Sequence, residues 1–526
     1  MNQKNVRTKK DAHPASKKSG AFQDDHDLAG ILLTANKEAE AESRALQIIR
    51  KIEAGQSLAE SEMQYEISSI EELQGLLLPT QEWQRRYDES VRDDSIIYRG
   101  LSLDQQINQC LQLLTKEEFG LANLPYQFDW CENNSIELLY NEKGRERFFA
   151  RLLDDLRNAK RHIHIAMFGM KGRINNQADI AWQVAQILAQ KAEAGVEVRL
   201  ILDAKGSGLA FLGRYEHARP FVEWMQQRGI DIVINHSLSP YHLKRFLSFD
   251  HRKLFVIDGE IGYCGGMGIE NHFFGDWFDV MIRMEGDVVN QLQIHFLSSW
   301  RWQGGSVGML QPQPDYAKLR QHYFPRFHHR AGNQKAKLLV NIPDPGPRVI
   351  KEEYISAIES TSENFYFMNP YCFTDWIIAK IKHRAEELYK KGKSWQPAMS
   401  NPVGVLAMFA SEGFDFPMNA ALEHELPGLN RARVGVLIYP GVLHGKLYVQ
   451  DRLWSNIGSC NIDDASFERN WETNVLIEDQ DFADEVLNTL FKQNEHRAEI
   501  KVDSTLQPSL TKRVVNAGAD QLDKLI

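Results

Sequence analysis

The sequence contains no apolar run long enough to cross a lipid bilayer. A membrane-spanning helix needs about 18 or more consecutive apolar residues, and no window of the 526-residue chain approaches that length. The N-terminus is basic, but it lacks the apolar segment of a secretory signal peptide. We therefore expect a cytoplasmic protein with no signal peptide and no transmembrane segment.

Cysteine is scarce, and its spacing does not match the usual metal or disulfide patterns. The chain has no CxxC pair and no Cys/His ligand spacing, on which zinc sites and disulfide-rich domains depend. No carboxylate-rich cluster indicates another metal. We expect no metal, no other cofactor and reduced thiols at the five cysteines, Cys110, Cys131, Cys264, Cys372 and Cys460.

The chain also has no excess of positive charge. The formal net charge is -10, whereas domains that bind nucleic acid are usually basic because they neutralise phosphates. Nucleic acid is therefore not the expected partner. A local basic cleft on an acidic protein remains compatible with this charge, so a nuclease stays open as an alternative.

Periodicity and composition divide the chain into segments. Apolar residues spaced three and four apart predict helices up to about residue 130, whereas strands and helices alternate from about residue 135 onward. A stretch rich in Gly, Gln, Pro, Arg and His predicts a linker. The expected segments are a disordered basic tail (1–24), a helical N-terminal extension (25–134), a first α/β domain (135–302), a linker (303–334), a second α/β domain (335–500) and a C-terminal tail (501–526).

The second domain repeats the order of elements in the first. HIHIAMFGM (162–170) and VEVRLILDA (196–204) predict buried strands separated by an amphipathic helix. In the second domain, NFYFMNPY (364–371) and VGVLAMFA (403–410) stand in the same order around another helix. This alternation indicates an α/β fold in which each domain has a mostly parallel sheet flanked by helices.

One short motif occurs at the same place in each copy. HRKLFVID (251–258) and HGKLYVQD (444–451) both read His-x-Lys-x4-Asp and lie 193 residues apart. Residues two apart on a strand face the same side, so each His and its Lys should project together. Two copies within a repeat argue against chance and against ordinary core histidines. The predicted catalytic residues are His251, Lys253, Asp258, His444, Lys446 and Asp451.

These residue types suit the cleavage of a phosphodiester. The reaction needs a nucleophile, an acid for the leaving oxygen and cations near the non-bridging oxygens. Two histidines can divide the first two tasks if one is neutral and the other protonated, and the lysines supply the charge without a metal. The residues alone leave open which histidine attacks.

The residues that follow each motif add candidates for substrate binding and for orienting the histidines. A Gly-Gly or Gly-Ser pair follows each motif at the same spacing, which lets the backbone approach a ligand. Ser459 and Asn461 are candidate donors to phosphate oxygens, together with Gly266 in the first copy. Glu472 is a candidate acceptor that fixes the tautomer of a histidine, and Asp279 is its nearest equivalent in the first copy.

Together these motifs resemble those of the phospholipase D superfamily, and within it those of bacterial cardiolipin synthases and similar phosphatidyltransferases. Besides both His-x-Lys-x4-Asp motifs, the resemblance includes Gly458-Ser459-x-Asn461-x-Asp463, Asn470-x-Glu472 and VEVRLILDAKGSG (196–208). It covers roughly residues 135–500. It implies two phospholipase D-like domains packed as a pseudo-twofold dimer, with one active site at their interface.

The resemblance also implies a mechanism. His251 would attack to give a phospho-histidine, His444 would protonate the leaving alcohol, and water or another alcohol would then resolve the intermediate. The chain departs from the cardiolipin synthases at Gly268, where asparagine often follows Gly-Gly. This departure removes a side chain that would contact an oxyanion.

A glycerophospholipid is the substrate that the resemblance implies. The reaction would be transfer to a second lipid, as in cardiolipin synthesis, or hydrolysis to phosphatidic acid. We expect peripheral contact with the inner membrane, for which the aromatic and basic segment 236–251 is a candidate interfacial loop. The alternative is a metal-independent nuclease of the same superfamily, whose affinity for nucleic acid would fall steeply with salt.

Overall fold

The computed structural model describes residues 98–116, 124–125, 127–141, 147–209, 216–235, 248–274, 277–305, 314–325, 331–342, 348–370, 374–398, 400–412 and 425–500. The predicted tails 1–24 and 501–526 lie outside these residues, as do most of the predicted N-terminal extension and residues 236–247 of the candidate interfacial loop. None of the helices in the described ranges is long and apolar enough to cross a membrane.

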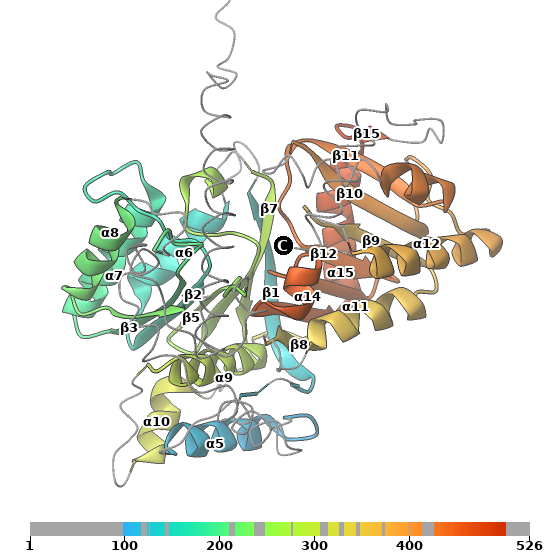
Figure 1. Ribbon diagram of the computed structural model, residues 1–526. Helices are drawn as coiled ribbons and strands as arrows, with labels where there is room; N and C mark the ends of the chain where they lie inside the picture. Colours follow the sequence, from blue (N-terminus) through green and yellow to red (C-terminus); the bar gives the residue numbers. More distant parts are fainter. Residues whose placement is uncertain are drawn as a thin grey trace, which may run out of the picture. The chain divides into compact units, whose positions relative to one another are not determined.

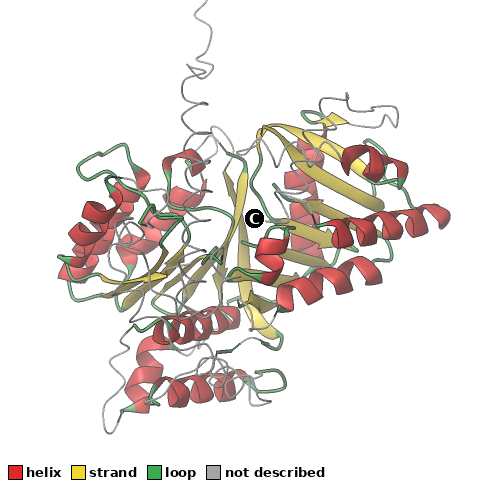
Figure 2. Cartoon of the chain, in the orientation of Figure 1, coloured by secondary structure: helices red, strands yellow, loops and turns green. Residues whose placement is uncertain are grey.

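Within the described ranges fifteen strands form one sheet, to which the first copy contributes seven and the second eight (Figures 1 and 2). The strand order is β15-β11-β10-β9-β12-β13-β14-β8-β1-β7-β6-β5-β2-β3-β4. The first half contributes β1 (Cys131–Asn141), β2 (His162–Met167), β3 (Glu197–Asp203), β4 (Asp231–Asn235), β5 (Lys253–Ile257), β6 (Ile261–Gly265) and β7 (Asp279–Glu285). The second contributes β8 (Gln334–Asn341), β9 (Asn364–Met368), β10 (Gly404–Glu412), β11 (Gly435–Val442), β12 (Leu447–Gln450), β13 (Trp454–Gly458), β14 (Glu472–Glu478) and β15 (Glu499–Ile500).

Helices pack on both faces of this sheet. In the first half they are α5 (Leu103–Leu114), α6 (Arg147–Asn158), α7 (Ile180–Glu193), α8 (Ala218–Gln226), the 3-10 turn η3 (Asn271–Phe273), α9 (Asp287–Trp302) and α10 (Tyr316–Tyr323). In the second they are α11 (Val349–Ser360), α12 (Asp375–Lys390), α14 (Asp464–Glu468), α15 (Gln480–Val486), the π-helical turn η4 (Leu487–Lys492) and α16 (Gln493–Glu495).

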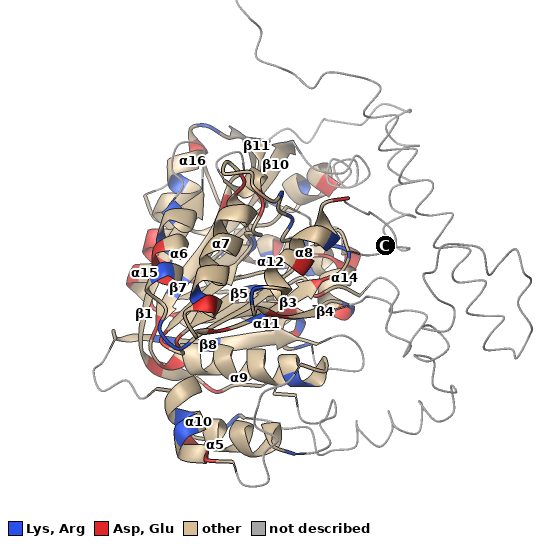
Figure 3. Cartoon of the chain, turned by 90° about the vertical axis from the view of Figure 1, so that its left-hand side faces the viewer, with Lys and Arg blue, Asp and Glu red and all other residues tan. Residues whose placement is uncertain are grey.

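The buried side chains form three cores, and one of them is shared by both halves. The shared core contains Leu292 of α9, Ile136 of β1, Leu338 of β8 and Phe482 of α15. Helix α9 has charged side chains only near its ends and runs along this face of the sheet (Figure 3). The other face has one core per half, beneath α6–α8 in the first and beneath α11 and α12 in the second. The expected α/β fold with two repeated halves is therefore confirmed.

The predicted mostly parallel sheet is wrong, because each half has a mixed sheet. Among the described strands, only β2-β3-β4 and β9-β10-β11 pair in parallel, whereas the pairs among β1, β7, β6, β5 and β2 are antiparallel. Short turns without a crossover helix join β5 to β6 and β12 to β13, and such hairpins are necessarily antiparallel. Asp258 and Asp451 stand in these turns with positive φ, as hairpin turns require.

The segment predicted as a linker contains a packed helix. Helix α10 (Tyr316–Tyr323) lies within residues 303–334, and Tyr323 and Phe324 are buried in the shared core. Strand β1 also begins at Cys131, slightly before the predicted start of the first domain. Helix α5, the described helix of the N-terminal extension, packs its apolar face on α9. The domain limits derived from the sequence stay predictions.

The two half-sheets join where β1 pairs with β8, at the centre of Figure 1. The register shifts between Cys131 and Asn134, so this ladder is irregular and leaves backbone groups to be paired in other ways. The fully buried Gln291 of α9 accepts from Leu338 N (3.0 Å) and donates to Asp129 O (2.8 Å). One side chain thereby bridges backbone groups on both sides of the junction.

Replacing Gln291 with alanine should destabilise the protein by removing this bridge. A buried N–H without a partner costs about 2 kcal/mol, so the free energy of unfolding should fall by at least that amount in a denaturant titration. Gln226→Ala on the exposed side of α8 is the matched control and should change stability by less than about 0.5 kcal/mol. Equal stabilities of the two variants would contradict the assignment.

Candidate active site

Both predicted histidines lie where a chain segment of one half pairs with the other half. His251, which precedes β5, donates its backbone N–H to Trp471 O of the second half at 3.0 Å. His444, which precedes β12, donates to Phe278 O of the first half at 2.8 Å. Residue Trp471 follows Phe278 by the same 193 residues that separate the histidines. The two bridges are therefore related by the pseudo-twofold axis.

The side chains of the histidines pair across the same boundary. His251 Nδ1 lies 2.9 Å from Glu472 Oε1, and His444 Nδ1 lies 2.7 Å from Asp279 Oδ2. Each carboxylate belongs to the half opposite its histidine, at the start of β14 or β7. A carboxylate accepts hydrogen bonds, so each Nδ1 bears the proton and each Nε2 presents a lone pair. The sequence predicted these two acceptors but not their exchange between halves.

Burial dominates the charge states at this site. It lowers the pKa of His251, although Glu472 raises it, and lowers that of His444 further with help from Lys446. Burial also raises the pKa of Asp279 to about 6. In the free protein at neutral pH these effects favour neutral imidazoles.

Lys253 and Lys446 each lie beside their own histidine. Lys253 Nζ donates to His251 O at 2.6 Å, and Lys446 Nζ donates to His444 O at 2.5 Å. An ammonium has three N–H groups, so each lysine keeps further donors for a ligand. Burial lowers the pKa of Lys253 to about 8 and that of Lys446 to about 7. The structure thus brings two histidines, two lysines and two carboxylates together.

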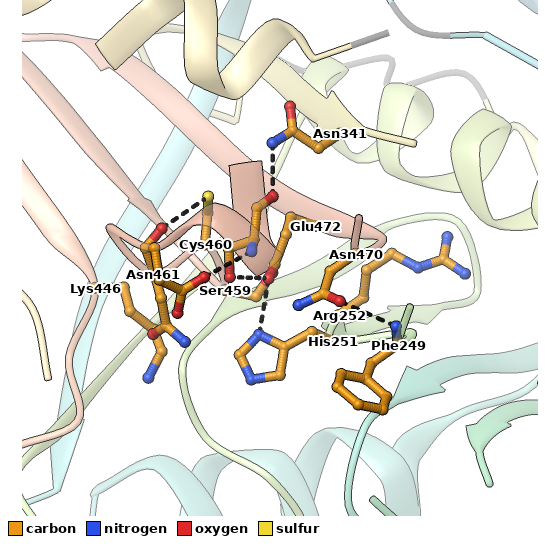
Figure 4. Close-up of polar contacts among 12 residues, drawn as sticks. Phe249, His251, Arg252, Asn341, Lys446, Ser459, Cys460, Asn461, Asn470 and Glu472 are labelled. Atoms are coloured by element: carbon orange, nitrogen blue, oxygen red, sulfur yellow. Dashed lines mark hydrogen bonds and ion pairs between the residues drawn. The ribbon is translucent and has the colours of Figure 1, made fainter. Parts of the chain in front are cut away.

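Glu472 is held more firmly than Asp279. Its carboxylate accepts from the hydroxyls of Ser459 and Ser466 in addition to His251, and Figure 4 shows it between Ser459 and the imidazole. Asp279 accepts from Val280 N at 2.7 Å. The predicted role of Ser459 as a phosphate donor does not fit this geometry, because its hydroxyl is fully buried and bonded to Glu472.

The other two predicted binding residues differ from each other. A side chain at Gly266 would put its Cβ 2.2 Å from Asp279 Oδ1, so this glycine makes room for the carboxylate rather than for a ligand. Asn461 lies beside Lys446 in Figure 4 and is 6% exposed. Among the described residues its Oδ1 has no hydrogen-bond partner. Because Oδ1 is an acceptor, the NH2 group of the same amide is what would donate to a phosphate oxygen, and Asn461 stays a candidate contact for a substrate.

The two motif aspartates lie outside the site. Asp258 accepts from the backbone N–H groups of residues 160–162, and Asp451 accepts from those of residues 362–364. Each stands at the end of its strand remote from the lysine, about 16 Å along an extended chain. This geometry does not support the predicted catalytic roles. We assign both residues to fixing the turn that precedes β2 or β9.

A buried ion pair next to His251 was missed by the sequence analysis. The Arg252 guanidinium donates to both carboxylate oxygens of Asp250 at 2.7 and 2.5 Å and lies 4.8 Å from the Trp471 ring centroid. Asp250 N in turn donates to Asp203 at 2.8 Å. The fully buried Asp250 and Arg252 flank His251 in sequence, and this spacing was the available signal. The equivalent positions Leu443 and Gly445 are uncharged.

Aromatic side chains of the first half cover His444. The rings of Phe273 and Trp277 each lie 5.4 Å from its imidazole, measured between centroids. Phe168 covers His251 in the same way at 4.9 Å. Among the described residues, no group of three or more His, Cys, Asp or Glu side chains is arranged to hold a metal ion.

Known proteins share these motifs and this fold. The family described as "Cardiolipin synthase, PLD-like domain" matches residues 152–300 and 354–493, which together exceed half of the chain. The chain belongs to the phospholipase D superfamily. The sequence-based assignment to this superfamily and to its cardiolipin synthase-like enzymes is confirmed.

Several relatives in this superfamily are bacterial cardiolipin synthases. The cardiolipin synthase of Staphylococcus aureus (strain Mu50) is 29% identical over 75% of this chain and 77% of its own length. Cardiolipin synthase 2 of Bacillus anthracis is 27% identical over 78% of this chain and 73% of its own.

A solved structure shares the fold. The crystal structure of phosphatidylserine synthase from Haemophilus influenzae Rd KW20 matches with a TM-score of 0.53 and 13% identity. The match covers 80% of this chain and 99% of that one.

Asp258→Ala should reduce stability rather than impair the chemistry directly. Loss of the acceptor for the N–H groups of residues 160–162 should lower the free energy of unfolding by about 3 kcal/mol. Activity measured well below the melting midpoint should be largely retained. The exposed Asp231→Ala at the start of β4 is the control. A variant of unchanged stability with the activity loss of a His251 variant would restore the catalytic assignment.

Proposed function

We propose that this protein is a phosphatidyltransferase that acts on glycerophospholipids through a phospho-histidine intermediate. The main support is the reciprocal pairing of His251 with Glu472 and of His444 with Asp279. This pairing fixes the tautomers of two imidazoles that lie beside two lysines. The sequence relatives named cardiolipin synthase support the lipid substrate.

In the first step His251 Nε2 attacks the phosphorus of the donor lipid. The bond from phosphorus to the head-group oxygen breaks, and that oxygen takes a proton from His444. The approach of the negatively charged phosphodiester raises the pKa of His444, which allows it to be protonated for this task. Glu472 stabilises the positive charge that develops on His251 during attack.

Lys253, Lys446 and Asn461 then stabilise the non-bridging oxygens. In a buried site these donors interact more strongly with developing charge than they would in water. In the second step an alcohol or water attacks the phospho-histidine and gives its proton to His444. Transfer to a second phospholipid would give a cardiolipin-type product, and attack by water would give phosphatidic acid.

Contact with the membrane surface follows from a lipid substrate. We place the protein peripherally on the inner membrane, because the substrate's phosphate lies at the lipid–water interface and the site is buried between the two halves. The nuclease alternative is less favoured, since the net charge is -10 and the named relatives are lipid enzymes. A steep dependence of nucleic-acid affinity on salt would revive it.

His251→Ala and His444→Ala should each lower activity by several orders of magnitude, because each removes one partner of a concerted proton and phosphoryl transfer. The measurement is mass spectrometry of the products formed from phosphatidylglycerol vesicles, where cardiolipin reports transfer and phosphatidic acid reports hydrolysis. EDTA should leave wild-type activity intact. Loss of activity in EDTA, or no change in any lipid, would contradict the proposal.

The order of the histidines can be tested separately. A short incubation with lipid labelled in its phosphatidyl group, followed by acid-free digestion, should leave label on the peptide that contains His251. His444→Ala should slow formation of this labelled peptide without moving the label. Label on His444 would reverse the two roles and leave the phosphatidyltransferase assignment standing.

The activity should have a narrow pH optimum. The pKa values of Lys446 and Lys253 are lowered to about 7 and about 8, so kcat/KM should fall as pH rises through this range and the lysines lose charge. The pKa of Asp279 is raised to about 6, so Asp279 becomes protonated below that pH. His444 then no longer has a charged carboxylate as its partner, and activity should fall. An optimum between pH 6 and 7 is expected from these values.

Lys446→Arg provides the control for the alkaline limb. A guanidinium keeps its charge throughout this range, so the alkaline fall should move to higher pH, whatever the loss in maximum rate. An alkaline limb that stays in place in this variant would exclude Lys446 as its cause.

A further inference from the structure

The backbone of the segment before β5 is bonded to the first half on both sides of His251. On one side, Asp250 N donates to Asp203 Oδ2 at 2.8 Å, and Asp203 is the last residue of β3. On the other side, Arg252 O accepts from Phe168 N at 3.0 Å. The main chain that carries the imidazole is therefore fixed at the residue before it and at the residue after it.

The side chain of Arg252 connects the same segment to helix α9 and to the second half. Its guanidinium donates two hydrogen bonds to the Asp250 carboxylate. It also donates to Ser299 Oγ at 2.8 Å and to His295 Nε2 at 3.0 Å, and both of these residues belong to α9. The guanidinium lies over the ring of Trp471, whose carbonyl oxygen accepts the backbone N–H of the histidine.

The three equivalent positions of the second half carry no charge. They are Ala410, Leu443 and Gly445. The last two lie 193 residues after Asp250 and Arg252. The first aligns with Asp203 when residues are counted from the equivalent pairings of β2 with β3 and of β9 with β10. Leu443 is instead buried in the shared core. The charged set therefore belongs to one histidine only.

The fold itself does not require these charges. Asp203, Asp250 and Arg252 are fully buried, and the desolvation of a buried ion pair offsets much of the attraction within it. The second half builds the equivalent segment with uncharged side chains. A role in placing the neighbouring His251 explains the three charges better than a contribution to stability does.

The two carboxylates of this set also act on Lys253. Burial lowers the pKa of Lys253 to about 8, and Asp250 and Asp203 are among the carboxylates that raise it. Burial raises the pKa of Asp203 itself to about 7, although its hydrogen bonds to backbone N–H groups lower it. Removal of either negative charge should therefore make Lys253 lose its proton at a lower pH.

We propose, on the basis of the proposed function, that Asp203, Asp250 and Arg252 are positioning residues that fix the main chain of His251 for its attack on phosphorus. Glu472 fixes the tautomer and the orientation of the ring. The position of Nε2 also depends on the main chain, which the three residues hold. Figure 4 shows the Arg252 side chain directed away from the His251 imidazole, so it acts through the histidine rather than on a substrate.

Covalent chemistry makes position more critical for His251 than for His444. In the proposed reaction the bond from Nε2 to phosphorus forms while the bond to the head-group oxygen breaks. It breaks again when the entering oxygen bonds to phosphorus and gives its proton to His444. Both steps need the His251 ring in line with that oxygen. His444 passes only a proton, which needs hydrogen-bond reach and can also go through a water molecule.

Asp250→Asn tests this role because it keeps the size of the side chain and removes its charge. With phosphatidylglycerol vesicles, kcat should fall on the order of a hundredfold while KM changes by less than about threefold, since attack rather than lipid binding is impaired. In a single turnover, label should reach the His251 peptide correspondingly more slowly. Asp203→Ala, which introduces the side chain that the second half has, should act in the same direction and covers the case in which Asp250→Asn does not fold.

The pH profile separates positioning at the site from a general loss of structure. In the Lys446→Arg background, the alkaline limb of kcat/KM should report Lys253. Addition of Asp250→Asn to Lys446→Arg should move that limb to lower pH, because Lys253 loses a neighbouring negative charge. A purely structural defect would lower the rate and leave the limb in place.

A second ion pair provides the matched control. Asp484 accepts two hydrogen bonds from Arg452 at the turn between β12 and β13, away from the lysines. Asp484→Asn should leave kcat and the pH profile unchanged. Folded Asp250→Asn and Asp203→Ala variants with wild-type kcat, or an alkaline limb that does not move, would overturn the positioning role. A wild type inactive towards every phospholipid would instead overturn the proposed function.

Discussion

The exchange of carboxylates between the two halves is the constraint on which the rest of the site depends. Glu472 orients His251 and Asp279 orients His444, each across the interface. Neither half therefore contains a complete histidine–carboxylate pair. The backbone hydrogen bonds to Trp471 and Phe278 hold each histidine next to the carboxylate of the other half. The shared core beneath β1 and β8 fixes the relative position of the halves. A fused repeat meets this requirement because it keeps both halves at fixed stoichiometry.

Burial shifts the pKa values of the lysines and carboxylates at the site, and these shifts can favour the binding of a phosphate. Desolvation alone would neutralise the lysines and protonate the carboxylates, and the opposite charges only partly offset it, so the pKa of Lys446 lies at about 7 and that of Asp279 at about 6. A bound phosphodiester would place negative charge beside the two lysines and would thereby favour their protonated forms. The site is thus more complementary to a bound, charge-developing phosphate than to water.

Much of this could be predicted from the sequence, because a repeat with a motif at a fixed offset is a strong signal. The sequence pointed to His251, His444 and the two carboxylates that the structure pairs with them, and the α/β class follows from alternating strands and helices. The structure does not favour the catalytic role predicted for the motif aspartates, because β5 separates Asp258 from Lys253 along its whole length. The role predicted for Ser459 as a phosphate donor is not favoured either, because its hydroxyl is bonded to Glu472 of the neighbouring strand β14. Contacts of this kind depend on register, which the sequence does not specify.

The pseudo-twofold symmetry of the site matches only part of the reaction. A phosphate has equivalent non-bridging oxygens, and the pairs of histidines and lysines around it are correspondingly symmetric. In the proposed mechanism the alcohol lies on one side of the phosphorus only, and one histidine holds the phosphatidyl group. We therefore associate the features that break the symmetry with binding of the alcohol and with the different roles of the two histidines. In this chain they are the hydroxyl donors around Glu472 and the ion pair of Asp250 with Arg252 beside His251.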